Sequence, residues 1–463
     1  MYIDYRNSII LFQQGGSDMK IFTSYSVRIK HYSHIFKDTV NLYRSAVDML
    51  IEICLNEWEE TVVLKGHEQL TFIETLMHST KDHPTVKYPE FDKRFYKFPS
   101  YLRRGAINEA IGKVSSYKSN LANWEEGGQK TRGKRPSLPR AGNTFPCMYR
   151  TNMYEQTGLY EAKIKVFIRN TWDWLPVQLK KSDMDYIARH CALRRQCPPA
   201  LVKRGRHWIL EFPFEENVTL NETDIFDQTI IAVDLGINNA ATISVMNSEG
   251  TVTGRHFLKL PGEYDSLTHA VNRIKKTQQH GNRKIPRLWA KAKGINDDIA
   301  VKTARFIMDI AIACEADTIV FEHLDTGGKK HGSKKQRLHM WRSSYVQNMV
   351  TDKAHRMGMR ISRICAWGTS RYAFDGSGAV MRGKDAGFTS YSICRFKSGK
   401  VYNCDLNASY NIGARYFIRE ILKSLPARER LALEAKVPQA AKRSTCTLSV
   451  LINLNAELMA ITA

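Results

Sequence analysis

Three acidic residues stand where hydrophobic segments end or a helix begins. Asp234 follows the apolar run "IIAV" and Glu322 follows "TIVF", so each places a carboxylate at the end of a segment typical of a buried strand. Asp405 opens the segment "DLNASYNIGARYFIREIL", whose apolar residues recur at helical spacing. Strand ends in one mixed α/β sheet can converge, so these carboxylates could share a site although they are far apart in sequence.

Carboxylates that are brought together repel one another, and burial raises their pKa values. A divalent cation removes both penalties, and Mg²⁺ prefers oxygen ligands with positions left open for water and phosphate. Two such ions, roughly 3.5–4 Å apart, can activate water and stabilise the leaving oxygen of a phosphodiester. The acids therefore predict a site for Mg²⁺, with two ions expected, over a nucleic-acid backbone. The alternative, that each acid ends a strand or caps a helix independently, stays open for any one of them.

The segments around these acids predict a mixed sheet with helices. From about residue 228, "IIAVDLG" and "AATISVM" predict a hairpin, and "VTGRHFLKL" predicts a third strand. A long helical tract is expected over about 264–315, interrupted near Gly281 and Gly294. "DTIVFEHL" and "GMRISRIC" predict two further strands. Residues beyond about 425 give no clear pattern.

The N-terminal half predicts a different organisation. Alternating segments indicate β-structure, whereas apolar residues at spacings of three and four indicate helices, one of which covers about 101–124 after the start signal Pro99-Ser100. The expected division is an extension (1–18), a β-rich module (19–30 with 146–220), a helical region (31–125) and a flexible basic linker (126–145). The fold class expected for the whole chain is a multidomain combination of α/β and α+β parts.

The charge balance limits the classes of partner. Among 463 residues there are 69 Lys and Arg against 46 Asp and Glu, a net charge of +23. Such an excess on a chain without any apolar run near the roughly 18 residues of a membrane span favours a polyanionic partner, nucleic acid first and a membrane surface second. No signal peptide is visible, so we expect a cytoplasmic protein with access to nucleic acid. The nine cysteines form no C-x-x-C pair, and a disulfide framework is not expected.

The segments "AVDLGINNAATIS", "TIVFEHL" and "CDLNASYNIGAR" resemble the three split motifs of a RuvC nuclease domain. The sequences of these motifs resemble those of the TnpB family of transposon-encoded RNA-guided nucleases and of the compact type V CRISPR effectors. "NMVTDKAHRMGMRISRI" and "WGTSRYAFDGSG" resemble supporting segments in the family's order. The resemblance is specific over roughly 228–420 and only general before that.

The resemblance implies a role for each part of the chain. The β-rich module would be a wedge domain, 31–125 a helical recognition lobe, 225–364 the first part of an RNase H-like (RuvC) nuclease, 365–404 an insertion that binds target nucleic acid, 405–425 the third RuvC motif and 426–463 a C-terminal tail. Asp234, Glu322 and Asp405 would be the catalytic, metal-binding acids. An arginine before the third acid would stabilise charge on the scissile phosphate, with Arg382 as first choice and Arg395 as second.

One departure from the family concerns zinc. The family's insertion usually holds two C-x-x-C pairs, whereas this chain offers only the widely spaced Cys365, Cys394 and Cys404 there. Four tetrahedral ligands are not recognisable, so we expect the insertion to be a degenerate zinc ribbon that folds without zinc.

Binding an RNA–DNA duplex of roughly 20 base pairs requires a positive channel that reads the backbone. The resemblance also implies that the helical recognition lobe reads a short motif that flanks the target sequence. We expect this contact near Tyr101, Arg103 and Asn108. Any single basic residue is more often merely solvated, but the clusters are candidates as a set. The further nucleic-acid contacts expected are Arg104, Arg194, Arg195, Lys203, Arg204, Arg206, Arg273, Lys329, Lys330, Lys334, Lys335, Thr369 and Ser370.

The resulting hypothesis is an RNA-guided, Mg²⁺-dependent DNA endonuclease. Its partners would be a guide RNA, either transposon-derived or a CRISPR RNA, and double-stranded target DNA, with no membrane. One protein copy per guide is expected, and a dimer is possible. Two alternatives remain: a guided DNA-binding repressor that does not cleave, and an unguided RNase H-like nuclease or transposase.

Overall fold

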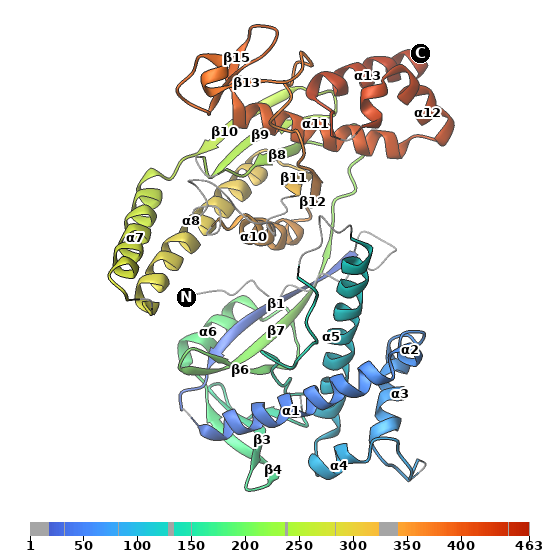
Figure 1. The fold of residues 1–463 in the computed structure, drawn as a ribbon, viewed down its shortest axis with the longest axis vertical. Coiled ribbons are helices and arrows are strands. Elements are labelled where there is room, and N and C mark those ends of the chain that lie inside the picture. The colour runs from blue at the N-terminus through green and yellow to red at the C-terminus, as the bar shows by residue number, and fades with distance from the viewer. Residues whose placement is uncertain are drawn as a thin grey trace. The chain divides into compact units, whose positions relative to one another are not determined.

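A computed structural model of the chain describes residues 18–31, 33–81, 83–127, 134–149, 151–236, 239–282, 284–323, 341–442 and 444–462. These residues form two compact units, one of Phe22–Glu216 and the other of 217–462 together with 18–21 (Figure 1). Both units combine helices and strands, as the sequence predicts for a mixed α/β chain with several parts. No helix in the described ranges is long and apolar enough to cross a membrane.

The N-terminal unit contains two small sheets and six helices in its described part. Strand β7 pairs with β1, β5 and β6, and a second sheet has the order β2-β3-β4. The elements are β1 (Asp18–Arg28), α1 (His34–Asn56), α2 (Trp58–Thr61), α3 (His67–Met77), α4 (Glu90–Arg94), α5 (Ser100–Glu126), β2 (Tyr154–Gln156), β3 (Glu161–Ile168), β4 (Thr171–Gln178), α6 (Lys181–His190), β5 (Arg195–Gln196), β6 (Ala200–Arg204) and β7 (His207–Thr219).

One hydrophobic core joins the helices and the sheets of this unit. Buried residues of α1, such as Val40 and Leu50, belong to the same cluster as Ile107 of α5 and Phe212 of β7. The helical region and the β-rich module that the sequence analysis separated are therefore packed together. Helix α5 begins at Ser100, which confirms the start signal at Pro99-Ser100.

The C-terminal end of the expected basic linker is hydrogen-bonded to α1. The backbone N–H of Ala141 donates to the carboxylate of Asp48 on α1, and Arg44 Nε donates to the carbonyl of Thr144 over 2.9 Å. Ala141 and Thr144 are both buried. Long-range hydrogen bonds thus tie this end of the segment to α1, although its composition is typical of a loop.

The C-terminal unit is built on a five-stranded sheet with the order β10-β9-β8-β11-β12. Strands β8 (Ile230–Asp234), β9 (Ala241–Met246) and β10 (Val252–Leu258) form the predicted antiparallel meander. Strands β11 (Thr318–His323) and β12 (Arg360–Cys365) extend it in parallel with β8.

Helices cover both faces of this sheet (Figure 1). One face carries α11 (Cys404–Ser424), and the other carries α8 (Pro286–Ala313) and α10 (Ser343–Arg356), with α7 (Pro261–Gln279) packed on α8. The break near Gly281 is confirmed, but the break expected near Gly294 is wrong. Helix α8 continues through Gly294 because tertiary packing of its buried face outweighs the cost of about 1 kcal/mol for one glycine.

The remaining elements follow β12. Residues 381–403 form a small three-stranded sheet of β13 (Met381–Arg382), β14 (Ile393–Arg395) and β15 (Val401–Asn403), with the 3-10 turn η2 (Gly383–Ala386). The tail, which shows no clear sequence pattern, forms α12 (Ala427–Lys436), η3 (Pro438–Ala441) and α13 (Leu448–Thr462). Leu451 and Leu454 of α13 belong to the hydrophobic cluster that also holds α11.

Close contact between α11 and the sheet fixes the direction of this helix. A Cβ atom on Gly413 would lie 3.1 Å from the sulfur of Met246 and 3.2 Å from the Cβ of Ala232, so the helix backbone approaches as only glycine allows. Ser409 Oγ hydrogen-bonds to Ser244 Oγ over 2.6 Å and lies 3.1 Å from the Ala232 carbonyl. Further along the helix, Tyr416 donates to Gln228, just before β8. The helix therefore runs antiparallel to β8, and its first turn lies at the end of the strand occupied by Asp234.

We expect Gly413→Leu to destabilise the C-terminal unit because the added side chain must push α11 away from β8 and β9. Overpacking of this kind costs about 1–3 kcal/mol, measurable as a lower midpoint in thermal unfolding. Gly112→Leu is the matched control, since a Cβ at this exposed position of α5 meets nothing within 4 Å. Equal midpoints for the two variants would contradict the packing argument.

Candidate active site

The register of two parallel strands places two of the predicted acids side by side. Val233 of β8 pairs with Phe321 of β11, and the next residues along the strands are Asp234 and Glu322. Alternation puts both side chains on the face that Ala232 and Val320 share, which is the face covered by α11. The carboxyl ends of the two strands therefore carry adjacent carboxylates on one face of the sheet.

Asp405 reaches the same place from the first turn of α11. Asn403 caps this helix, its side chain accepting from the backbone N–H groups of Asp405 and Leu406. The position also suits a carboxylate because the N-terminal end of a helix carries a partial positive charge. The structure thus brings together the three acids that the sequence analysis predicted to converge.

The pKa of Asp234 reflects the closeness of the three acids. Burial raises the pKa of Asp234 well above its usual range, and the negative charges of Glu322 and Asp405 raise it further. The positive charge of Arg382 acts in the opposite direction. Burial also raises the pKa of Glu322, which a hydrogen bond from Thr369 and the charge of Arg415 partly offset.

Neutral donors hold two of the three acids. Thr369 donates its hydroxyl to the Glu322 carboxylate, and Gln347 of α10 donates to the Glu322 carbonyl over 3.0 Å. Asn239 Nδ2 donates to Asp405 over 2.6 Å. Both donors are neutral, so these bonds fix the carboxylates without adding a positive charge to the cluster.

A buried polar atom beside Asp234 has no partner among the described residues. Thr242 of β9 stands opposite Asp234 in the antiparallel register, and its fully buried Oγ1 makes no hydrogen bond. An orphan hydroxyl next to three carboxylates adds another hard oxygen to the set, and such oxygens are the ligands of Mg²⁺. The donor set therefore fits a divalent cation, although no three acidic, His or Cys side chains of the described residues are already close enough to ligate one ion.

Of the two arginines that the sequence analysis considered, Arg382 is the one whose charge acts on Asp234. Its guanidinium donates to the carbonyl of Ser370, next to the Thr369 that holds Glu322. Arg395 lies across from Met381 on the neighbouring strand and packs over the ring of Phe388 at 5.4 Å. The charge of Arg382, and not that of Arg395, influences Asp234.

Arg415 organises the same region and was not singled out from the sequence. It is 5% exposed, and its guanidinium donates to the carbonyls of Cys365, Trp367, Ser444 and Cys446. It joins the end of β12, the Thr369 segment and the tail to α11. The sequence could have indicated Arg415 and also Asn239, which binds Asp405, because both residues lie inside the segments that resemble nuclease motifs.

The cysteines of the insertion do not gather as a set. Cys394 and Cys404 are buried together in the core of the three-stranded sheet, whereas Cys365 is exposed at the end of β12. A hydrogen bond between the first two raises the pKa of Cys394 and lowers the pKa of Cys404.

The predicted nucleic-acid contacts are dispersed. Tyr101 and Asn108 are exposed on α5, but Arg103 is only 8% exposed and its guanidinium is bound by Glu74, which also binds Arg104. Because Arg103 is buried and paired with Glu74, its role is structural, and the prediction that it contacts nucleic acid is wrong. Lys329, Lys330, Lys334 and Lys335 lie outside the described residues.

Most of the other predicted cations are on the surface of β5–β7 or α7. Arg194 and Arg195 pair with Glu216 and Glu215, and Arg204 pairs with Glu211. Arg206 and Arg273 are exposed, and the Lys203 ammonium lies 5.6 Å from the Trp208 ring centroid. Three of these cations are therefore already partly neutralised by carboxylates.

Comparison with known proteins assigns the class. A family described as "Probable transposase" matches residues 213–330, and "TnpB-like protein aq_aa05" from Aquifex aeolicus (strain VF5) is 26% identical over 230 residues, covering 46% of this chain and 74% of that protein. With the convergent acids, these matches define a TnpB-like protein.

The N-terminal half carries a second relationship. The Aq_aa04 family matches residues 23–168, and "Uncharacterized protein aq_aa04" from the same organism is 32% identical over 133 residues, covering 28% of this chain and 70% of that protein. The chain belongs to the Aq_aa04 family.

Solved structures give only weak similarity. A Cas12f1–sgRNA–target DNA complex aligns with a TM-score of 0.34 at 14% identity, covering 85% of this chain and 98% of that one. CasPhi-2 (Cas12j) bound to crRNA aligns with a TM-score of 0.35 at 10% identity, covering 85% of this chain and 97% of that one. Scores this low assign neither a partner nor an activity.

The raised pKa of Asp234 predicts a pH-dependent stability. A carboxyl whose pKa is higher in the folded than in the unfolded protein favours folding at low pH, and this contribution is lost as pH rises through the folded-state pKa. In EDTA, Asp234→Asn should therefore unfold at a higher temperature than the parent at about pH 8, and the gain should shrink toward about pH 4–5. Thermal unfolding, monitored by circular dichroism, measures the midpoints of the two proteins at each pH.

Asp309→Asn is the control for this comparison, because Asp309 is an exposed carboxylate whose ion pair with Arg305 is long, at 3.6 Å. It should change the midpoint little at either pH. A lower midpoint for Asp234→Asn than for the parent at pH 8 would contradict the electrostatic description of the site.

Proposed function

We propose that this protein is an RNA-guided DNA endonuclease that cleaves double-stranded DNA at one RNase H-like site. The observation that carries the proposal is the placement of Asp234 and Glu322 on adjacent strand ends, with Asp405 brought to them by α11. A meander of three antiparallel strands followed by two parallel ones, with helices on both faces, supports an RNase H-like assignment of the sheet.

The acids would hold Mg²⁺, with two ions expected. When bound, such ions activate water and stabilise the leaving oxygen of a phosphodiester. Asp234, Glu322 and Asp405 would supply the carboxylate ligands, and the hydroxyl of Thr242, opposite Asp234, has no partner within the described ranges. Thr369 and Asn239 each donate to one oxygen of Glu322 and of Asp405, so the second oxygen of each carboxylate would be the metal ligand.

Arg382 would contribute to the reaction electrostatically. Its guanidinium donates to the Ser370 carbonyl, and its positive charge lowers the pKa of Asp234. A fixed cation in this position stabilises the negative charge that develops on a scissile phosphate, and because it is preorganised, it costs no rearrangement during the reaction.

A guide RNA is proposed because the chain is strongly basic and carries a large unit besides the nuclease-like one. The net charge of +23 suits a nucleic-acid partner, and the TnpB-like class supports guidance by RNA. An unguided transposase-like nuclease is the second candidate, favoured by the description of the family that matches residues 213–330. The repressor alternative lacks such support because the three acids are intact.

We expect Asp234→Ala to abolish cleavage because it removes one of the ligands that would hold the metal ions. The test purifies the full chain with its bound RNA, sequences that RNA, and incubates the complex with Mg²⁺ and a plasmid that carries the complementary sequence. Asp309→Ala, which changes an exposed carboxylate, is the matched control and should cleave normally.

The two variants should co-purify with equal amounts of RNA. Cleavage by Asp234→Ala would refute the site, and a bound RNA without a defined sequence would favour the unguided candidate. Normal target binding without cleavage by the parent would favour the repressor.

Arg382→Gln should lower the cleavage rate by about a hundredfold, the usual effect of losing one preorganised charge or donor at a phosphoryl or acyl transfer site. Arg395→Gln, on the neighbouring strand of the same small sheet, should cleave within a few-fold of the parent. Single-turnover cleavage rates measure both, and circular dichroism checks that both variants are folded. A larger loss for Arg395→Gln would reverse this assignment.

A further inference from the structure

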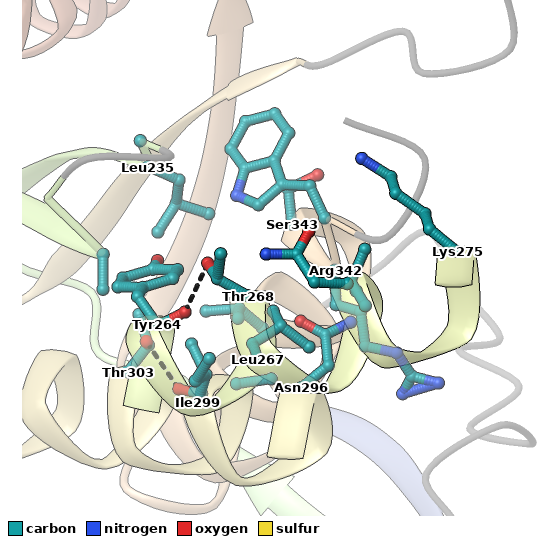
Figure 2. Close-up of a pocket in the computed structure, with 17 residues that line it drawn as sticks. Leu235, Tyr264, Leu267, Thr268, Lys275, Asn296, Ile299, Thr303, Arg342 and Ser343 are labelled. Atoms are coloured by element: carbon teal, nitrogen blue, oxygen red, sulfur yellow. Dashed lines mark hydrogen bonds between the residues drawn. The ribbon is translucent and has the colours of Figure 1, made fainter. Parts of the chain in front are cut away.

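A cavity of about 170 Å³ opens on the sheet face opposite to the acids. Figure 2 shows its lining residues, which come from α7, α8, the start of α10 and the loop after β8. Leu235 and Gly236, which line it, directly follow Asp234 in the chain. Alternation along β8 sends the Asp234 side chain toward α11 and the Leu235 side chain into the cavity. The cavity and the acids thus lie on either side of one strand end.

A buried hydroxyl in this cavity lacks a partner among the described residues. Ser343 is 1% exposed, lines the cavity, and its Oγ makes no hydrogen bond. A buried hydroxyl without a partner costs about 1–3 kcal/mol, so an unpaired one facing an open cavity indicates a polar group that arrives from outside. Asn272 and Asn296 add amide groups to the same lining.

The rest of the lining is apolar and aromatic. Tyr264 and Trp341 supply rings, and Leu235, Val271 and Ile299 supply aliphatic surface. Lys275 is exposed and belongs to the lining (Figure 2). Flat apolar walls, a few hydrogen-bonding groups and a cation at the rim match a nucleobase attached to a phosphate, because bases stack on aromatic rings and use their edges for hydrogen bonds.

We propose that this cavity receives one unpaired nucleobase of the DNA strand that is being cut. This inference rests on the proposed function, since it assumes that Asp234 acts on a phosphodiester. With the strand's backbone at Asp234, a neighbouring nucleotide lies at the Leu235–Gly236 side of the strand end, where its base enters the cavity. Ser343 then binds an edge of the base, and Lys275 faces the adjacent phosphate. The base would hold the strand in register with the catalytic acids.

The test fills the cavity and follows the base directly. Thr268→Trp places a large ring in the cavity from an exposed position of α7, and Thr277→Trp is the matched control. Both threonines lie on α7 and donate to the carbonyl four residues earlier, but Thr277 does not line the cavity. The probe is single-stranded DNA with 2-aminopurine at one position at a time, mixed with the RNA-loaded protein carrying Asp234→Asn to prevent cutting.

One position of 2-aminopurine should change its emission on binding, and the change should vanish in Thr268→Trp and persist in Thr277→Trp. Binding measured by anisotropy should weaken about tenfold in Thr268→Trp, within the range for losing one stacked base. Ser343→Ala should also weaken binding while its thermal midpoint stays level or rises, since the deleted hydroxyl has no partner among the described residues. A purely structural cavity would leave binding unchanged in both variants.

Identical emission and affinity for Thr268→Trp and Thr277→Trp would overturn the inference. This outcome is separable from failure of the proposed function. If the protein with Asp234 intact does not cleave DNA but the emission change follows the cavity variants, the nuclease assignment fails and the base site stands. If cleavage depends on Asp234 but the emission is insensitive to the cavity, the base site fails alone.

Discussion

The close approach of α11 to strands β8 and β9 is the constraint on which the candidate site depends. Gly413 lets the helix backbone lie against Ala232 and Met246. The Ser409–Ser244 hydrogen bond fixes the position of α11 along the strands. Because the helix runs antiparallel to β8, this contact delivers Asp405 to the strand end that carries Asp234. Small residues in the middle of the helix therefore decide where a charged residue in its first turn comes to lie.

Bringing these acids together is unfavourable by itself. Burial and mutual repulsion raise the pKa of Asp234, while Thr369 and Asn239 hold the other two carboxylates without cancelling their charge. Groups that keep an unfavourable arrangement in place are characteristic of functional sites, since stability alone would favour apolar replacements. The fully buried and unpaired hydroxyl of Thr242 beside the acids is a second cost of the same kind.

The two units carry different relationships. The N-terminal unit contains the region matched by the Aq_aa04 family, and the C-terminal unit contains most of the region matched by a transposase family, together with the convergent acids. Within the N-terminal unit, helices and sheets share one core, so the unit is one folded body. Its ion pairs, such as Arg103 with Glu74, show that a basic residue in such a body can serve packing instead of a ligand.

The sequence by itself determined the two strands and the helix that carry Asp234, Glu322 and Asp405. The apolar runs before Asp234 and Glu322 and the helical spacing after Asp405 were sufficient, because strand and helix periodicity are local properties. Convergence could be expected, but only the tertiary structure decided it, through the β8–β11 register and the Gly413 contact. Local patterns also failed where distant partners dominate: Gly294 did not end α8, and Asp48 and Arg44 ordered a segment with the composition of a linker. The Ser343 cavity had no sequence signal at all, because it is formed by segments far apart in the chain.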